Sequence, residues 1–140
     1  MLKSNLLHPE LLRALGGAGH GSKVLIGDGN YPFGTGGPPE ATRVYLNLAP
    51  GVLDAVQVLE ALAGAIPIEA AEVMVPEKGP EPAIFADFRS VLGKGVPLQS
   101  LGRFQFYDAA RDRNTTLVIA TGEQRIYANI LLTIGVVPPP

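Results

Sequence analysis

Apolar residues along the chain recur at two spacings, one typical of helices and one typical of strands. After Pro9, which suits the first turn of a helix, apolar side chains keep helical spacing until the glycine-rich stretch 16–19. Similar spacing resumes after Pro50, which is expected to open a second helix. The pattern as a whole predicts helices over about 9–15, 50–62, 83–92 and 104–111.

Short apolar runs between these helices are predicted to be strands. The run 23–27 is almost continuously apolar, which suits a strand covered on both faces, as in a parallel sheet. The expected strands cover 23–27, 43–48, 70–75, 98–101, 116–120 and 128–133. This alternation predicts an α/β fold, a three-layer sandwich with a mainly parallel central sheet flanked by helices.

Length and charge narrow the picture. A chain of 140 residues fits a single domain spanning 1–140. The hydrophobic fraction is 46% and the charged fraction only 17%, so we expect other copies to cover part of the surface in a homo-oligomer. The net charge of −2 argues against nucleic-acid binding, which requires a concentrated basic surface.

The sequence lacks the residue types that several classes of functional site require. The absence of cysteine excludes disulfides, thiolate metal sites and a cysteine nucleophile. With two histidines and no carboxylate at ligand spacing, we expect neither a metal nor another cofactor. We find no export signal and no membrane-spanning stretch, and therefore expect a cytoplasmic protein that does not bind membranes.

Few residues can perform acid–base chemistry, and His20 is the main candidate. It lies between Gly19 and Gly21, a setting that exposes the ring, and an imidazole can give and take protons near neutral pH. The alternative is an ordinary histidine in a turn. His8, just before Pro9, is expected only to start a helix.

Two charged residues are candidates for holding a polar ligand. Asp28 follows the strand 23–27, and ligands of open α/β sheets bind beyond the carboxyl ends of strands. Arg103 could donate hydrogen bonds to ligand oxygens through its guanidinium group. The structural alternatives are an aspartate that caps its own loop and a surface arginine packed on Phe104.

The segment 127–129 brings polar side chains to the start of the last strand. If Tyr127 and Asn129 belong to the strand, they share one face and Ala128 points the other way. Such a pair needs hydrogen-bond partners from the protein or from a ligand. Glu123 could support Tyr127 or Arg103, although a purely structural pairing explains it equally well.

Three segments together resemble the ribose pyranase and fucose mutarotase family over essentially the whole chain. The first is Gly19-His20-Gly21 followed by Asp28-Gly29-Asn30-Tyr31-Pro32. The second runs from Gly51-Val52 to Gln57-Val58-Leu59. The third runs from Thr121-Gly122-Glu123 through Tyr127-Ala128-Asn129-Ile130-Leu131-Leu132 to Gly135-Val136.

The resemblance implies an enzyme that interconverts the ring forms of a reducing monosaccharide without a metal. It implies that His20 is the acid–base residue and that Asp28, Arg103, Tyr127, Ala128 and Asn129 contact the sugar, with Glu123 and Tyr107 in support. The segment Arg103-Phe104-Gln105-Phe106-Tyr107 is similar to the fucose branch, whereas the Gly/Pro-rich stretch 34–39 departs from the usual loop. The family forms rings, commonly decamers of two pentamers.

His20 and Asp28 are expected to lie far apart in one chain. A strand over 23–27 is about 16 Å long at 3.3 Å per residue, so the two residues lie near its opposite ends. We therefore expect a composite site at a subunit interface, completed by His20 of a neighbouring copy. Two other functions remain open at this point, a ring protein that binds a sugar without converting it and a purely structural ring.

Overall fold

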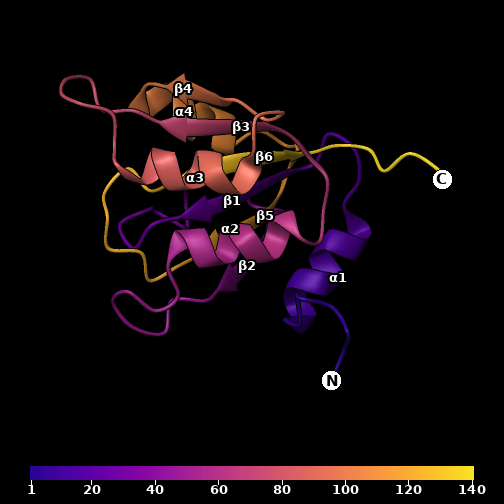
Figure 1. The fold of residues 1–140 in the computed structure, drawn as a ribbon. Helices are drawn as coiled ribbons and strands as arrows, with labels where there is room; N and C mark the ends of the chain where they lie inside the picture. Colours follow the sequence, from indigo (N-terminus) through magenta and orange to yellow (C-terminus); the bar gives the residue numbers. More distant parts are fainter.

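The computed structural model describes residues 1–140, in which strands and helices alternate along most of the chain (Figure 1). The helices are α1 (Pro9–Gly17), α2 (Ala55–Ala63), α3 (Ile84–Leu92) and α4 (Arg103–Ala110). The strands are β1 (Lys23–Gly27), β2 (Thr42–Tyr45), β3 (Ile68–Met74), β4 (Leu98–Leu101), β5 (Thr115–Ala120) and β6 (Ile130–Ile134). None of the helices combines the length and the hydrophobicity that a membrane span requires.

All strands belong to one six-stranded sheet in the order β2-β5-β1-β6-β3-β4. The pairs β2–β5, β5–β1 and β3–β4 are parallel, whereas β6 runs antiparallel to its neighbours β1 and β3. The sheet is therefore mainly parallel, as the sequence predicts. Because β1 and β3 both oppose β6, the carboxyl ends of β1, β3 and β4 lie along the same edge.

Two clusters of buried side chains cover the opposite faces of the sheet. The larger cluster joins α1, α2 and α3 to the face that carries Val24 and Ile26 of β1. The smaller one joins α4 to the other face, where Leu25 packs in a cluster with Phe106 and Ala110. Figure 1 shows α2 and α3 side by side along the sheet and α4 beside β4. The arrangement confirms the three-layer sandwich.

Helix α2 begins later than the proline pattern predicts. Its N-cap is Asp54, whose carboxylate accepts the backbone N–H of Gln57 at 2.8 Å, while Gln57 Oε1 accepts the N–H of Asp54 at 3.0 Å. This reciprocal capping fixes the first turn at Ala55. The prediction of a start at Pro50 is therefore wrong, and 50–53 form a loop in which Val52 is 44% exposed.

Candidate active site

A cavity of about 290 Å³ opens at the edge of the sheet where β1, β3 and β4 end. Asp28 follows β1, Met74 ends β3, and Arg103 begins the helix that follows β4. This is the edge at which open α/β sheets bind ligands. The cavity is lined by Asp28, Asn30, Tyr31, Met74, Arg103, Tyr107, Ile126, Tyr127 and Asn129.

The chain must turn tightly after β1 to bring Asp28 and Tyr31 to this cavity. A side chain at Gly27 would meet the ring of Phe33 at 2.6 Å, so only glycine fits under the following loop. The loop then folds back on itself, and the Tyr31 hydroxyl donates a hydrogen bond to Gly36 O at 2.7 Å. The ring of Tyr31 lies 5.7 Å from that of Tyr107 and closes one wall of the cavity.

Asp28 is a buried carboxylate fixed by the backbone around it. Its Oδ1 accepts the N–H of Asn30 at 2.9 Å and its Oδ2 accepts the N–H of Ala128 at 3.2 Å. The Asp28 N–H in turn donates to Asn129 Oδ1 at 2.8 Å. Asp28 thus links the end of β1 to the segment before β6, and the two halves of the cavity are held in one geometry.

Burial raises the pKa of Asp28, because a charge at a site only 3% exposed loses its hydration. The N–H groups of Asn30 and Ala128 and the side chain of Asn129 oppose this rise but do not cancel it. The carboxylate of Glu123 adds to it through repulsion. Any further hydrogen-bond donor, such as a hydroxyl group of a ligand, would stabilise the charged form of this buried carboxylate.

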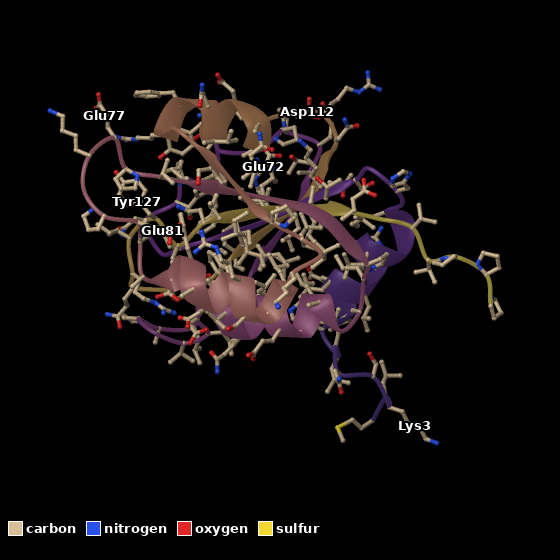
Figure 2. All side chains as sticks on the ribbon, turned by 45° about the horizontal axis from the view of Figure 1, so that its top comes forward. Lys3, Glu72, Glu77, Glu81, Asp112 and Tyr127 are labelled. Atoms are coloured by element: carbon tan, nitrogen blue, oxygen red, sulfur yellow. The ribbon has the colours of Figure 1, made fainter.

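The segment 127–129 precedes β6 and does not belong to it. Tyr127 has a φ of 58°, in the left-handed region that non-glycine residues rarely adopt. The prediction that Tyr127 and Asn129 share a strand face is therefore wrong, although both line the cavity. Ala128 does not line it, because its side chain lies in the core and its N–H binds Asp28. Figure 2 shows Tyr127 at the same end of the molecule as Glu77 and Glu81.

Helix α4 carries Arg103 and Tyr107 one turn apart at the cavity. The guanidinium carbon of Arg103 lies 5.6 Å from the ring centre of Phe104 and 5.8 Å from that of Tyr107. Stacking on aromatic rings holds the cation without an acidic partner, and Arg103 makes no ion pair within the chain. Its guanidinium donors therefore remain available to a ligand in the cavity.

Glu123 supports the fold next to the cavity and makes no hydrogen bond to Tyr127 or Arg103. Its carboxylate accepts hydrogen bonds from Arg125 Nε at 2.9 Å and Nη2 at 2.8 Å and from the N–H of Ala55 at 3.2 Å. Burial disfavours the charge, but Arg125 and the backbone donors outweigh it and lower the pKa of Glu123 to about 2. Of the two alternatives that the sequence leaves open for Glu123, these hydrogen bonds correspond to the structural pairing.

Four residues of the cavity did not emerge as candidates from the sequence: Asn30, Tyr31, Met74 and Ile126. The first two stand in the segment that follows Asp28, so the loop motif itself was the available signal. Met74 could have been found as the last residue of a strand parallel to β1. Ile126, 67% exposed beside Tyr127, has no signal in the pattern of the sequence.

His20 lies at the opposite end of β1, outside the lining of this cavity. Its side chain is 60% exposed, and Nε2 lies 3.1 Å from both carboxylate oxygens of Glu69. The strand between His20 and Asp28 has five residues, which corresponds to about 16 Å. The structure thus brings five of the predicted site residues to one cavity (Asp28, Arg103, Tyr107, Tyr127 and Asn129) and leaves His20 apart.

The chain contains no cluster of three or more His, Cys, Asp or Glu side chains arranged to hold a metal ion. The polar groups at the cavity are instead one carboxylate, amides, phenols and a guanidinium. Such a set can bind an uncharged ligand rich in hydroxyl groups, since it offers both hydrogen-bond donors and acceptors.

Comparison with known proteins gives a consistent result over the full length of the chain. A model of the RbsD / FucU transport protein family matches residues 1–137. The D-ribose pyranase of Geobacillus kaustophilus is 35% identical over 136 residues, which cover 97% of this chain and 95% of that protein. The human fucose mutarotase is 34% identical over 141 residues, covering 94% of this chain and 90% of that protein.

Solved structures show the same fold. The structure of FucU from Bifidobacterium longum superposes with a TM-score of 0.79 at 32% identity, covering 94% of this chain and 95% of that one. The structure of Bacillus subtilis RbsD complexed with D-ribose has a TM-score of 0.85 at 24% identity, covering 99% of this chain and 100% of that one. The similarity therefore extends through every layer of the sandwich.

Proposed function

This chain belongs to the RbsD / FucU family, and from that premise we propose that it is a sugar mutarotase acting on a reducing monosaccharide. The observation that carries the proposal is the cavity in which Asp28, Arg103, Tyr127 and Asn129 meet. Relatives of this chain carry the names D-ribose pyranase and fucose mutarotase. A cavity of about 290 Å³ has room for one monosaccharide.

The proposed reaction is opening and reclosure of the hemiacetal. A base removes the proton of the anomeric hydroxyl while the C1–ring oxygen bond breaks and an acid protonates the ring oxygen. The open aldehyde rotates, and the ring oxygen attacks the other face of C1 with the proton transfers reversed. No electrons are exchanged with a cofactor, so positioned proton carriers are sufficient.

Each polar group has a part in this scheme. His20 carries the protons, because one nitrogen of an imidazole can donate a proton while the other accepts one. Asp28 orients sugar hydroxyls, Tyr127 and Asn129 hold the ring, and Arg103 stabilises negative charge as it develops on oxygen. Tyr107 supports Arg103 by stacking, whereas Ala128 contributes through its N–H, which holds Asp28.

The active site is composite in this proposal. His20 cannot reach the cavity of its own chain, because β1 separates it from Asp28 by about 16 Å. A second copy placed head to tail would bring its His20 to the cavity, and repetition of that contact would close a ring. We propose a homo-oligomer, a decamer of two pentameric rings, with each cavity at a subunit interface.

A fucose-like sugar is the proposed substrate, with ribose as the alternative, because the segment Arg103-Phe104-Gln105-Phe106-Tyr107 resembles the fucose branch of the family. We also propose that residues 1–140 act as one domain, in keeping with their single sheet. The cytoplasm is the proposed compartment, since a chain without cysteine has no disulfide that would require an oxidising one.

Saturation-transfer NMR on fucose, ribose, galactose and glucose tests the function. We expect the protein to accelerate exchange between the anomers of fucose, and of ribose more weakly. Saturable binding of a sugar without faster exchange would instead identify a sugar-binding ring protein. Absence of both would contradict the assignment of the cavity to a monosaccharide.

A further inference from the structure

Arg125 is the centre of a network of hydrogen bonds just before Tyr127. Its Nε and Nη2 donate to the two carboxylate oxygens of Glu123 at 2.9 and 2.8 Å, and its Nη1 donates to Asp87 Oδ2 at 3.1 Å. The backbone N–H of Arg125 also donates to Glu123 Oε1 at 2.9 Å. All three guanidinium nitrogens are therefore engaged, which fixes the orientation of the side chain better than a single contact would.

Both acceptors of Arg125 are held by helices. Asp87 lies in the first turn of α3. The carboxylate of Glu123 is buried and accepts the N–H of Ala55, the first residue of α2, at 3.2 Å. Arg125 thus ties the segment before Tyr127 to α2 and α3, the two helices that lie side by side along the sheet (Figure 1).

Tyr127 stands between this network and a second anchor. Its φ of 58° lies in the left-handed region, which costs free energy in a residue with a side chain and persists where the surrounding structure imposes it. After Tyr127, the N–H of Ala128 donates to Asp28 Oδ2 at 3.2 Å. Before it, Ile126 alone separates Tyr127 from Arg125, and the Ile126 side chain is mostly exposed, so packing does not hold the turn at this point. The conformation of Tyr127 is therefore imposed by hydrogen bonds on either side.

From this geometry we propose that Arg125 is a positioning residue for Tyr127, an inference that rests on the proposed function. Arg125 does not line the sugar cavity, whereas Tyr127 does. Without Arg125, the backbone of Tyr127 is free to return to the more favourable negative φ, and the phenol then leaves the place from which it holds the sugar ring. The effect falls on sugar binding rather than on proton transfer, which His20 performs in the proposed function.

A positive charge alone does not replace Arg125. A lysine ammonium lacks the planar fork that binds both oxygens of one carboxylate while a third nitrogen reaches another. The other ion pair of α3 supplies a matched control, because Arg89 also donates to both carboxylate oxygens of its partner, Glu81. The variant Arg89→Gln removes that pair without changing the segment 123–127.

The test compares Arg125→Gln, Arg125→Lys, Asp87→Asn and Arg89→Gln in the full chain by exchange NMR on fucose. For Arg125→Gln we expect KM to rise about tenfold with little change in kcat. Arg125→Lys should resemble Arg125→Gln rather than wild type. Asp87→Asn leaves the contact with Glu123 and should raise KM about twofold. Arg89→Gln should match wild type in both constants.

The variant Tyr127→Gly separates positioning from general stabilisation of the fold. Glycine accepts a φ of 58° without strain, and the change removes the phenol. Adding Arg125→Gln to Tyr127→Gly should therefore raise KM no further, because residues that act as a unit have non-additive effects. Tyrosine ring signals of ¹³C-labelled protein give a second measurement. Arg125→Gln should shift the Tyr127 signal, which is identified by its absence from Tyr127→Phe, and leave that of Tyr45 on β2 unchanged.

An unchanged KM in Arg125→Gln would overturn the inference. A further rise in KM on adding Arg125→Gln to Tyr127→Gly would overturn it too, as would a rise with an unshifted Tyr127 signal, because Arg125 would then act through the rest of the fold. Thermal unfolding shows whether each variant folds, and Asp87→Asn carries the comparison if Arg125→Gln does not. If wild-type protein exchanges no sugar, the proposed function fails, and the Tyr127 signal alone decides whether Arg125 positions the ring.

Discussion

The two ends of β1 differ in how completely the chain builds them. At the carboxyl end, Asp28 is buried, hydrogen-bonded on both oxygens, and surrounded by the lining of a cavity. At the amino end, His20 is 60% exposed and is held by one side chain, Glu69. One end is a formed pocket lined by polar groups, and the other is an exposed imidazole that does not line this pocket.

The contrast shows what a chain can supply alone. A binding pocket needs burial, which the loops around Asp28 and the segment 126–129 provide within one copy. An acid–base group needs access to the ligand, and the exposed turn leaves the ring of His20, the proposed group, accessible. In the proposed assembly, the two requirements meet when another copy of the chain places its His20 at this pocket.

Removal of the imidazole should have the largest effect on the reaction. Since a positioned acid–base group gives about 10²–10⁴-fold, we expect His20→Ala to lose that factor in anomer exchange, or about 3–5 kcal/mol of transition-state stabilisation. Exchange NMR on fucose measures this loss. Because His20 is exposed, the melting temperature should stay near that of wild type. A variant with wild-type exchange would refute the role of His20.

Neutralisation of Asp28 should weaken sugar binding by about 10- to 150-fold, since a hydrogen bond to a charged group contributes about 1.5–3 kcal/mol and each 1.4 kcal/mol is a factor of ten. Asp28→Asn also removes the cost of a buried charge, which offsets the loss of one acceptor for Asn30 or Ala128. Stability should therefore change less than affinity. Calorimetry with fucose gives the affinity, with Asp108→Asn on the exposed side of α4 as the control. Equal affinities of the two variants would contradict a sugar-binding role.

Acid should weaken the loop beside the cavity, because Glu123 stabilises the fold as a charged carboxylate. Glu123 has a pKa of about 2 in the folded chain and 4.5 as its ordinary value. A lowered pKa contributes stability above the ordinary value, and this stability is lost as pH falls from about 4.5 toward 2. We expect a loss on the order of 2 kcal/mol, measured by urea unfolding across this range.

The control for the acid effect is Arg125→Gln, which removes the side chain that lowers the pKa of Glu123. This variant should be less stable than wild type at neutral pH and should lose less stability on acidification. A wild-type pH dependence in Arg125→Gln would show that other groups control acid unfolding.

The smallest effect is expected in the Gly/Pro-rich loop. Arg43 holds this loop by donating hydrogen bonds to the carbonyls of Phe33, Gly34, Gly37, Pro38 and Ala41. A lysine ammonium cannot reach this set, so Arg43→Lys should cost about 1 kcal/mol of stability. Hydrogen exchange should rise within 33–41 and not in 126–129. Uniform acceleration throughout the chain would show that Arg43 stabilises more than the loop.

Much of the fold could be predicted because apolar periodicity reports burial directly. The run at β1 predicted a strand covered on both faces, and the structure buries Val24, Leu25 and Ile26 completely. The apolar spacing predicts too early a start for helix α2, because Val52 and Leu53 continue that spacing. Capping by Asp54 decides where the helix starts. Local hydrogen bonding of this kind leaves no trace in periodicity.

Site residues that directly follow a strand could be predicted from the sequence. Contacts between residues far apart in the sequence could not. Asp28 and Arg103 stand just beyond β1 and β4, so their convergence follows from parallel strands. The sequence does not identify the partner of Glu123, because its bond to Arg125 depends on a turn that spacing does not reveal. Glu69 was missed, since only the bulge in β3 directs it to His20.

The central claim, a site shared between copies, is tested most directly by combining two defective chains. His20→Ala and Asp28→Asn are co-expressed with different tags, mixed oligomers are isolated, and their exchange of fucose anomers is compared with that of each parent. Random assembly gives about a quarter of the interfaces an intact His20 facing an intact Asp28, if the ring contacts are head to tail. We predict exchange clearly above the mean of the two parents. Mixed oligomers no more active than that mean would contradict the shared site.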